Sequence, residues 1–306
     1  MKNQYYIVAP CYNESNVINL FLKEIESKLR GSKFYFTIVI VDDASIDDSA
    51  KILSKFEFES SKFSLKVIRL EYNMGHQAAI NTGLNYVNNF RNKLKGVIVM
   101  DSDGEDDPNA INELTSFNDF DIVLVVRGKR KEGRFFKLGY FAYKLLFRIV
   151  TGKRINFGNF SLISPEVLKC IHNQRFLHYP AFLSKQKFNI DKIVYNRQDR
   201  MNGKSKMSKK GLVFHGLLSM IEYSEEILFF LIKVFFVTFI ISSIHGIYII
   251  YSKFILKNAI LGWASSVGAS LIIICLLIIN TIIIGLLLIS IKKTIASKIN
   301  AYEEIR

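Results

Sequence analysis

Five acidic residues fall within seven positions at the end of an apolar run. Residues 97–100 are Val-Ile-Val-Met, and directly after them come Asp101, Asp103, Glu105, Asp106 and Asp107. So many like charges repel one another unless a positive group lies among them. Hard cations such as Mg²⁺ and Mn²⁺ prefer oxygen ligands and commonly bridge carboxylates to substrate phosphates. The pattern predicts a metal and phosphate site, whereas an isolated Asp-x-Asp would be interpreted as a solvated acidic loop.

Two other apolar runs end in groups that can bind a nucleotide. Residues 36–41 run into Asp42 and Asp43, whose carboxylates can accept hydrogen bonds from a base or a ribose hydroxyl. Part of that segment has a simpler interpretation, because Ser45 or Asp47 can cap the next helix. The first apolar run ends in Pro10, Tyr12 and Glu14, where the proline shapes a turn and the tyrosine ring can lie against a base.

The elements that must position these residues alternate in type from residue 4 to about 127. Short β-branched runs predict strands at 5–9, 36–41, 65–70, 97–100 and 122–126. Amphipathic stretches predict helices at 15–29, capped by Asn13 or Ser15, and at 77–87 after Gly75. This alternation predicts an α/β fold, a doubly wound and mainly parallel sheet that places ligands at the carboxyl ends of its strands.

Two basic stretches follow the predicted sheet. Residues 127–154 carry ten Lys or Arg against one Glu, interleaved with aromatic and leucine residues, and residues 204–223 lead into an apolar tail. A basic amphipathic stretch suits a bilayer interface, although a solvated helix packed on the sheet is the alternative for the first. The net charge of +14 favours contact with anionic lipid, and no recognisable nucleic-acid motif is present.

The tail predicts two transmembrane helices. Residues 234–251 and 260–291 contain no charged side chain, and about 20 apolar residues suffice to cross a bilayer. A buried helical hairpin of a soluble protein is the less favoured alternative. Lys233 before the first span and Lys292 and Lys293 after the second predict that both ends are cytoplasmic. No signal peptide precedes the sheet, and the three cysteines have neither disulfide nor zinc spacing.

These features predict four segments. They are a cytoplasmic catalytic domain at 1–200, an amphipathic juxtamembrane helix at 201–226, the two spans within 227–291, and a cytoplasmic tail at 292–306. Small residues on the second span permit close helix packing, so a homo-oligomer is a further expectation, with simple lipid contact as the alternative.

At this point a resemblance emerges. In order, APCYNE, VDDASIDDS, EYNMGHQAAINTGL, VMDSDGEDDP and VVRGKR resemble glycosyltransferase family 2 with its GT-A fold. The chain from residue 5 to about 290 is similar to bacterial polyprenyl-phosphate glycosyltransferases and dolichol-phosphate mannose synthase relatives. The resemblance implies that Mg²⁺ or Mn²⁺ is held against the donor diphosphate by Asp101, Asp103 and Glu105. It implies a nucleotide-sugar site formed by Pro10, Tyr12, Glu14, Asp42, Asp43, Gly75, His76, Gln77 and Arg127.

One position departs from the family pattern. Residues 157–162 read FGNFSL, where relatives often read GDFRL with an aspartate proposed as the catalytic base, so Asn159 occupies that position. An amide cannot take a proton at neutral pH. A phosphate acceptor already carries an anionic oxygen, because its second pKa is about 6. Asn159 is therefore compatible with a polyprenyl-phosphate acceptor, and Asp106 or Asp107 would have to serve as base for a hydroxyl acceptor.

A cationic cluster precedes the membrane segment. It consists of Arg197, Arg200, Lys204 and Lys206. These side chains can bind an acceptor phosphate that emerges from the bilayer, or lipid headgroups alone.

The expected protein is therefore an enzyme of a bacterial inner membrane. It would transfer a sugar from a nucleotide-sugar, of which UDP is the family's usual nucleotide, to undecaprenyl phosphate, with metal and with inversion. One alternative is an enzyme that extends a lipid-linked saccharide during cell-envelope polysaccharide synthesis. The other is a noncatalytic membrane scaffold, and the intact acidic cluster argues against it.

Overall fold

A computed structural model describes residues 3–127, 143–145, 147–152, 157–196, 198, 209–257, 262–295 and 302–304. The chain forms two compact units. The first, here called the sheet domain, comprises Met1–Lys144, Arg154–Glu222 and Lys298–Arg306. The second, the helical unit, comprises Leu145–Lys153 and Tyr223–Ser297. Residues 145–153 of the predicted basic stretch thus belong with the apolar helices by their contacts.

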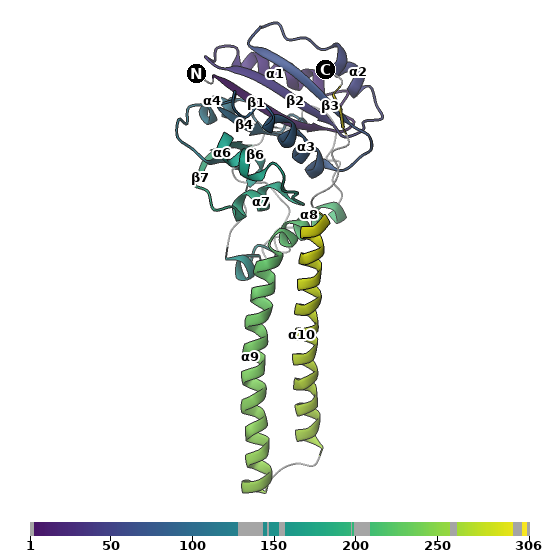
Figure 1. Cartoon of the computed structure of the whole chain (residues 1–306), viewed down its shortest axis with the longest axis vertical. Coiled ribbons are helices and arrows are strands. Elements are labelled where there is room, and N and C mark those ends of the chain that lie inside the picture. The colour runs from purple at the N-terminus through teal and green to yellow at the C-terminus, as the bar shows by residue number, and fades with distance from the viewer. Residues whose placement is uncertain are drawn as a thin grey trace. The chain divides into compact units, whose positions relative to one another are not determined.

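One mixed sheet organises the sheet domain, with the strand order β7-β5-β6-β4-β1-β2-β3-β8 (Figure 1). Strands β4, β1, β2 and β3 run parallel, whereas β6 pairs antiparallel with both β4 and β5. The strand bounds are β1 Gln4–Cys11, β2 Tyr35–Asp42, β3 Phe63–Leu70, β4 Gly96–Val99, β5 Ile122–Arg127, β6 Phe157–Ile163, β7 Ile190–Tyr195 and β8 Tyr302–Glu304. This confirms the predicted α/β, mainly parallel architecture.

Helices cover both faces of this sheet, because alternate residues of the central strands are apolar on each side. One core joins Ile7 and Ile38 to α1 (Ile18–Leu29), α2 (Ser49–Lys55) and α4 (Asn109–Leu114). The other joins Val8 and Val39 to α3 (His76–Asn88), α6 (Pro165–Ile171) and α7 (Tyr179–Lys185). Two buried layers around one sheet fix the ends of the strands, where the predicted site residues lie.

Helix α3 approaches the sheet closely at one glycine. A Cβ atom at Gly83 would lie 2.4 Å from Val8 Cγ1 and 3.0 Å from Val41 Cγ2. No real Cβ atom approaches a neighbour so closely, so only glycine allows this contact. Gly83 therefore sets the distance between α3 and the parallel strands, and with it the position of the helix start.

The predicted boundaries needed correction at one helix. α1 begins at Ile18 rather than at residue 15, and no side-chain cap hydrogen bond is formed at its start. The predicted capping by Asn13 or Ser15 was wrong, because both residues are bonded to the loop after β2, as described below. The five predicted strands and the helix after Gly75 are present with ends shifted by one or two residues.

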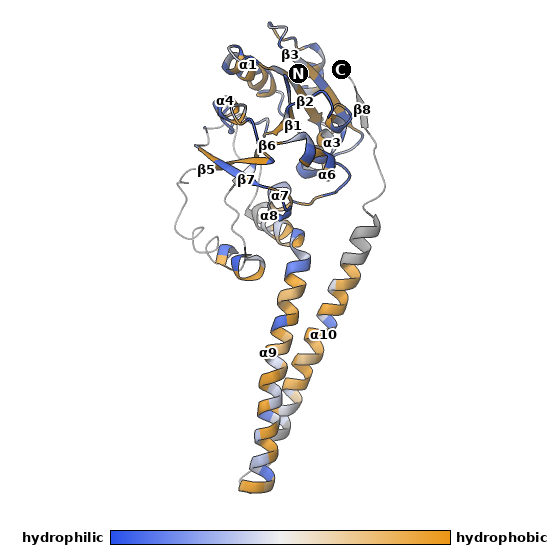
Figure 2. Cartoon of the chain, turned by 60° about the vertical axis from the view of Figure 1, so that its left-hand side comes forward, coloured by the Kyte–Doolittle hydropathy of each residue, from blue (hydrophilic) through white to orange (hydrophobic). Residues whose placement is uncertain are grey.

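The helical unit consists mainly of two long helices. α9 spans Ser224–Tyr251, a π-helical segment η1 follows at Ser252–Leu256, and α10 spans Trp263–Ile295. The segments Ser224–Leu256 and Ser266–Leu288 are long and apolar enough to cross a membrane, with mean hydropathies of 2.6 and 3.1. Figure 2 shows apolar residues all round both helices. Almost no residue of either segment is buried, unlike the core helices of a soluble protein.

The chain returns to the sheet domain after α10. Backbone pairing joins Ile68, Arg69 and Leu70 of β3 to residues 302–304 of β8 in antiparallel register. The segment predicted as a plain tail thus contributes an edge strand. Before α9, helix α8 (Lys209–Glu222) ends on the sheet domain, where the Glu222 carboxylate accepts a hydrogen bond from Leu177 N–H.

Candidate active site

The loops after β1 and β2 are bonded to each other. Asn13 N–H donates to Ser45 Oγ (2.9 Å), and Asn13 Oδ1 accepts from Ile46 N–H (2.9 Å). Ser15 N–H donates to Asp47 Oδ2 (3.0 Å). Asn13 has a φ of 54°, a left-handed conformation that asparagine tolerates better than most residues. These reciprocal bonds hold two strand ends as one rigid wall of the site.

Asp42 is fully buried and stabilises the loop after β2. Its Oδ1 accepts from Ser45 N–H (3.1 Å), and its Oδ2 lies 3.5 Å from Arg69 Nε. Ala44, between Asp42 and Ser45 in the chain, has a φ of 56°, a backbone conformation that costs a residue other than glycine about 1–3 kcal/mol. Arg69 was not singled out from the sequence, because a basic residue on a strand carries no distinctive signal.

Asp43 holds the start of α3. Its two carboxylate oxygens accept from Met74 N–H (2.7 Å) and Gly75 N–H (2.9 Å). Gly75 has a φ of 89°, which favours glycine, and its carbonyl accepts the first N–H groups of the helix. Burial raises the pKa of Asp43, the two N–H donors lower it, and the pKa lies above its ordinary value.

The other residues of the first strand end are also placed at this edge. The Pro10 carbonyl accepts from Ser102 Oγ (2.6 Å), which ties β1 to the acidic loop. Glu14 N–H donates to Ser49 Oγ (2.9 Å), and the Tyr12 side chain is exposed. The three residues predicted from the APCYNE motif therefore lie at the carboxyl end of β1.

The acidic loop after β4 is folded on itself. Asp106 is buried, and its Oδ2 accepts from Asp101 N–H (3.0 Å). Asp103 Oδ1 accepts from Glu105 N–H (3.1 Å), and Gly104 between them has a φ of 77°. The loop thus uses part of its acids to fix its own backbone, which presents Asp101 at the end of the strand.

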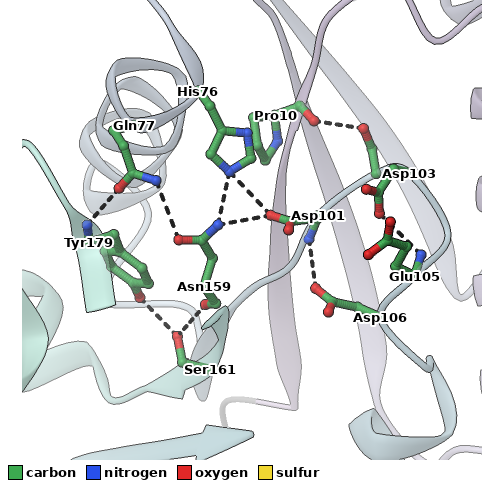
Figure 3. Close-up of polar contacts among 11 residues, drawn as sticks. Pro10, His76, Gln77, Asp101, Asp103, Glu105, Asp106, Asn159, Ser161 and Tyr179 are labelled. Carbon is green, nitrogen blue, oxygen red and sulfur yellow. Dashed lines mark hydrogen bonds and ion pairs between the residues drawn. The ribbon is translucent and has the colours of Figure 1, made fainter. Parts of the chain in front are cut away.

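Asn159 brings the acidic loop and α3 together (Figure 3). It lies on β6 and is buried. Its Nδ2 lies 3.0 Å from Asp101 Oδ1 and 2.9 Å from His76 Nε2. Its Oδ1 accepts from Gln77 Nε2 at 3.4 Å. Three residues predicted from two separate motifs therefore surround the amide that departs from the family pattern.

His76 is the basic group of this cluster. Its Nε2 lies 3.2 Å from Asp101 Oδ1. Loss of water lowers the pKa of His76, the carboxylates of Asp101, Asp103 and Asp106 raise it, and the pKa lies above its ordinary value. The neighbouring Asn159 Nδ2 donor instead favours a ring nitrogen that accepts, as in the neutral form. The carboxylates and the amide therefore make opposite demands on the Nε2 proton.

Tyr179 is a site residue that sequence reasoning missed. Its N–H donates to Gln77 Oε1 (2.5 Å), and its hydroxyl lies 3.0 Å from Ser161 Oγ. It is fully buried at the start of α7, where His178 Nδ1 accepts from Ala181 N–H. Gln77 and Tyr179 are 102 positions apart, and no sequence pattern signals their contact.

Some predicted residues lie outside what the structure describes. Arg127 ends β5 and pairs with Tyr195 through its backbone, but its side chain is not described. The predicted acceptor-phosphate residues, Arg197, Arg200, Lys204 and Lys206, lie outside the described residues. Within the described part, no three His, Cys, Asp or Glu side chains are grouped so as to hold a metal ion by themselves.

Known proteins resemble this chain along most of its length. An uncharacterized glycosyltransferase of Bacillus subtilis, YkcC, is 27% identical over 296 residues, which cover 91% of this chain and 87% of the relative. The undecaprenyl-phosphate 4-deoxy-4-formamido-L-arabinose transferase of Yersinia enterocolitica is 26% identical over 215 residues, or 68% and 63% of the two chains.

The fold also has solved counterparts. Mannosyl-3-phosphoglycerate synthase from Rubrobacter xylanophilus matches with a TM-score of 0.51 at 15% identity, over 72% of this chain and 73% of that chain. Residues 6–171, more than half of the sequence, match the family model "Glycosyl transferase family 2". The chain therefore belongs to glycosyltransferase family 2 and is a glycosyltransferase with a GT-A fold.

Proposed function

We propose that this protein transfers a sugar from a nucleotide-sugar to a polyprenyl phosphate at the cytoplasmic face of a bacterial inner membrane. The observation that carries the proposal is Asn159, a buried amide 3.0 Å from Asp101 at the position where relatives often have an acid. An amide cannot accept a proton from a sugar hydroxyl. A phosphate monoester needs no such base, because its oxygen is already ionised at neutral pH.

The other acids near Asn159 have structural partners. Asp106 Oδ2 accepts from Asp101 N–H, and Asp107 Oδ1 accepts from both the N–H and the Nδ2 of Asn109. These bonds hold the acidic loop and the start of α4. Each bond occupies one carboxylate oxygen, so either acid would have only its other oxygen to offer a sugar hydroxyl, which disfavours a hydroxyl acceptor.

The residues of the acidic loop fit a divalent cation by their chemistry. Asp101, Asp103 and Glu105 offer hard oxygen donors. Burial lowers the pKa of His76, but the negative charges of Asp101 and Asp103 raise it, and the same charges would attract a cation. Mg²⁺ is commonly bound by one or two carboxylates together with water and substrate phosphates. A site in which fewer than three side chains of the described residues gather around the ion is therefore compatible with Mg²⁺ or Mn²⁺. The bound cation would neutralise charge on the departing nucleoside diphosphate.

The wall formed by the β1 and β2 loops would bind the nucleoside. Tyr12 is exposed there for contact with a base, while Asp42 and Asp43 act by holding the loops and the start of α3. Gly75, His76 and Gln77 would lie near the donor, and Arg127 near a phosphate. In the reaction, an oxygen of the acceptor phosphate forms a bond to the anomeric carbon of the sugar. The bond from that carbon to the diphosphate oxygen of the donor breaks at the same time, and the configuration at the carbon inverts.

The two apolar helices support a membrane-bound acceptor. A polyprenyl chain lies in the bilayer, and α9 and α10 are long enough to cross it. Arg197, Arg200, Lys204 and Lys206 precede α8 and would bind the emerging phosphate. The Yersinia relative carries undecaprenyl phosphate in its name, which supports this acceptor class.

The test uses the full chain in detergent with labelled nucleotide-sugars, undecaprenyl phosphate and Mg²⁺ or Mn²⁺, with EDTA as control. Label in the lipid phosphate that depends on metal is the expected result and identifies the sugar. Donor hydrolysis without lipid labelling would favour extension of a lipid-linked saccharide. Absence of donor binding would favour a noncatalytic scaffold.

The metal assignment has a separate test. Asp101→Ala and Asp103→Ala should each lower turnover by about 100-fold or more, because each removes a carboxylate that would hold the cation against the departing diphosphate. Full activity in either variant would contradict the assignment.

A further inference from the structure

The two ends of the Gln77 amide have different partners. Its Oε1 accepts from Tyr179 N–H (2.5 Å), and its Nε2 faces Asn159 Oδ1 (3.4 Å) (Figure 3). A backbone N–H can only donate. The bond from Tyr179 therefore fixes which end of the Gln77 amide is oxygen, and Nε2 must point at Asn159.

The orientation of Gln77 fixes that of Asn159 in turn. Because Gln77 presents a donor, the Asn159 oxygen faces it, and the Asn159 Nδ2 group faces Asp101 Oδ1. Rotation of the amide by half a turn would place two donors together at Gln77 and two acceptors together at Asp101. A chain of directed hydrogen bonds thus runs from one backbone N–H to the acidic loop.

Tyr179 also holds the backbone of Asn159. Ser161 Oγ donates to the Asn159 carbonyl (3.1 Å), so the hydrogen shared by Ser161 and the Tyr179 hydroxyl must come from Tyr179. Burial raises the pKa of the Tyr179 hydroxyl, which keeps it a neutral donor. One buried tyrosine therefore positions the Asn159 backbone by way of Ser161 and the Asn159 side chain by way of Gln77.

We propose that Gln77 is a positioning residue that makes Asn159 present a donor to Asp101 and so orients the Asp101 carboxylate toward a divalent cation. The proposal rests on the proposed function in so far as Asp101 is a metal ligand. Groups that bond to metal ligands are known to change metal affinity by about 10- to 100-fold when they are replaced. Gln77 does not itself touch the reacting atoms.

The test compares two variants of equal size. In Gln77→Glu, one carboxylate oxygen still accepts from Tyr179 N–H, but the other attracts the Asn159 Nδ2 group and turns the Asn159 oxygen toward Asp101. Gln77→Met removes both polar ends, so Asp101 remains to orient Asn159 without the help of Gln77. Mn²⁺ affinity is measured on the full chain in detergent with UDP present, by electron paramagnetic resonance, together with melting temperature and metal-free UDP binding.

Gln77→Glu should raise the Kd for Mn²⁺ about tenfold or more while its melting temperature stays near that of the wild type. Gln77→Met should weaken Mn²⁺ binding less. A merely structural role, in which Gln77 only satisfies Tyr179 N–H, gives the opposite order, because glutamate still accepts that bond and methionine does not. Unchanged Mn²⁺ affinity in Gln77→Glu would overturn the proposal.

The matched control is Asn81→Asp, which adds the same charge one turn later on α3. Asn81 Nδ2 donates to the Gln174 carbonyl, away from the acidic loop, so Mn²⁺ affinity should not change. If Gln77→Glu does not fold, Gln77→Met decides, and wild-type Mn²⁺ affinity in that variant overturns the proposal. Lipid labelling by the wild type tests the proposed function independently of this comparison.

Discussion

On the proposed function, Asn159 is the residue that limits the kind of acceptor. It lies between His76, Gln77 and Asp101, so any replacement is felt by all three. A carboxylate at this position would lie about 3 Å from another carboxylate, where like charges disfavour ionisation of both. The amide avoids this repulsion and keeps a neutral group beside the negatively charged acidic loop.

Asn159→Asp should therefore lower kcat/KM for transfer to undecaprenyl phosphate by about tenfold or more, which corresponds to about 1.4 kcal/mol. The added charge repels both Asp101 and an anionic acceptor. The measurement is lipid labelling at saturating metal, with Asn81→Asp as the charge-matched control. A kcat/KM of Asn159→Asp equal to that of the wild type would show that residue 159 does not determine the choice of acceptor. A higher rate of transfer to a hydroxyl acceptor would favour extension of a lipid-linked saccharide.

At the scale of elements, the reciprocal bonds between the β1 and β2 loops replace the cap of α1 expected from the sequence. Asp47 accepts from the N–H of Ser15 in the β1 loop and also from the N–H of Ser49 at the start of α2. Burial raises the pKa of Asp47, the donors from Ser49 and Ser15 lower it by more, and the pKa lies below its ordinary value.

The folded state thus binds this proton less readily than the unfolded state, so ionised Asp47 adds stability above about pH 4 that is lost as pH falls through the folded pKa. Asp47→Asn should lower the stability of the sheet domain by about 1 kcal/mol at pH 7, because its NH₂ group opposes an N–H donor. At pH 3 the difference from wild type should shrink, as followed by thermal unfolding. The control is Asp48→Asn, an exposed neighbour 4.0 Å from Lys51 Nζ, which should behave like the wild type at both pH values.

The contact of α3 with the sheet gives a second prediction at this scale. Gly83→Ala should destabilise the sheet domain by about 1–3 kcal/mol, because the new methyl group meets Val8 and Val41. It should also lower activity, since α3 carries His76 and Gln77. Gly31→Ala is the matched control, because nothing lies within 4 Å of its added Cβ. Equal unfolding midpoints of the two variants would contradict this account of helix packing.

The sequence predicted elements better than it predicted their partners. Five strands and the acidic loop were recognised because apolar runs ending in acids are local patterns. β6 was not, because FGNFSLI mixes polar and apolar residues and its pairing with β4 and β5 depends on residues far away in the chain. Tyr179 was missed for the same reason. The role of Asp43 was also only partly predicted, since its bonds to Met74 and Gly75 depend on how two loops meet.

At the scale of the whole molecule, labelling of cysteines can test the proposed orientation, in which the sheet domain lies on the cytoplasmic side of the membrane. The chain has Cys170 exposed on the sheet domain and Cys11 buried within it. If the sheet domain is cytoplasmic, a membrane-impermeant maleimide should label Cys170 only after cells are permeabilised. Lys253→Cys, in η1 at the end of the first candidate span that lies away from α8, should be labelled in intact cells. Labelling of Cys170 in intact cells would show that the sheet domain lies on the outer side of the membrane, which contradicts the proposed orientation.

If α9 and α10 cross a membrane, as proposed, the pairing of β8 with β3 limits how many times the chain can cross it. The chain leaves the sheet domain after α8 and re-enters the same sheet at residues 302–304, so the intervening segment is an insertion with both ends on one side. Only an even number of crossings satisfies this condition. A third span would carry β8 across the bilayer and leave the β3 edge with unpaired N–H and C=O groups, which favour pairing with another chain. In that arrangement, β8 can pair with β3 only if the chain crosses the membrane an even number of times.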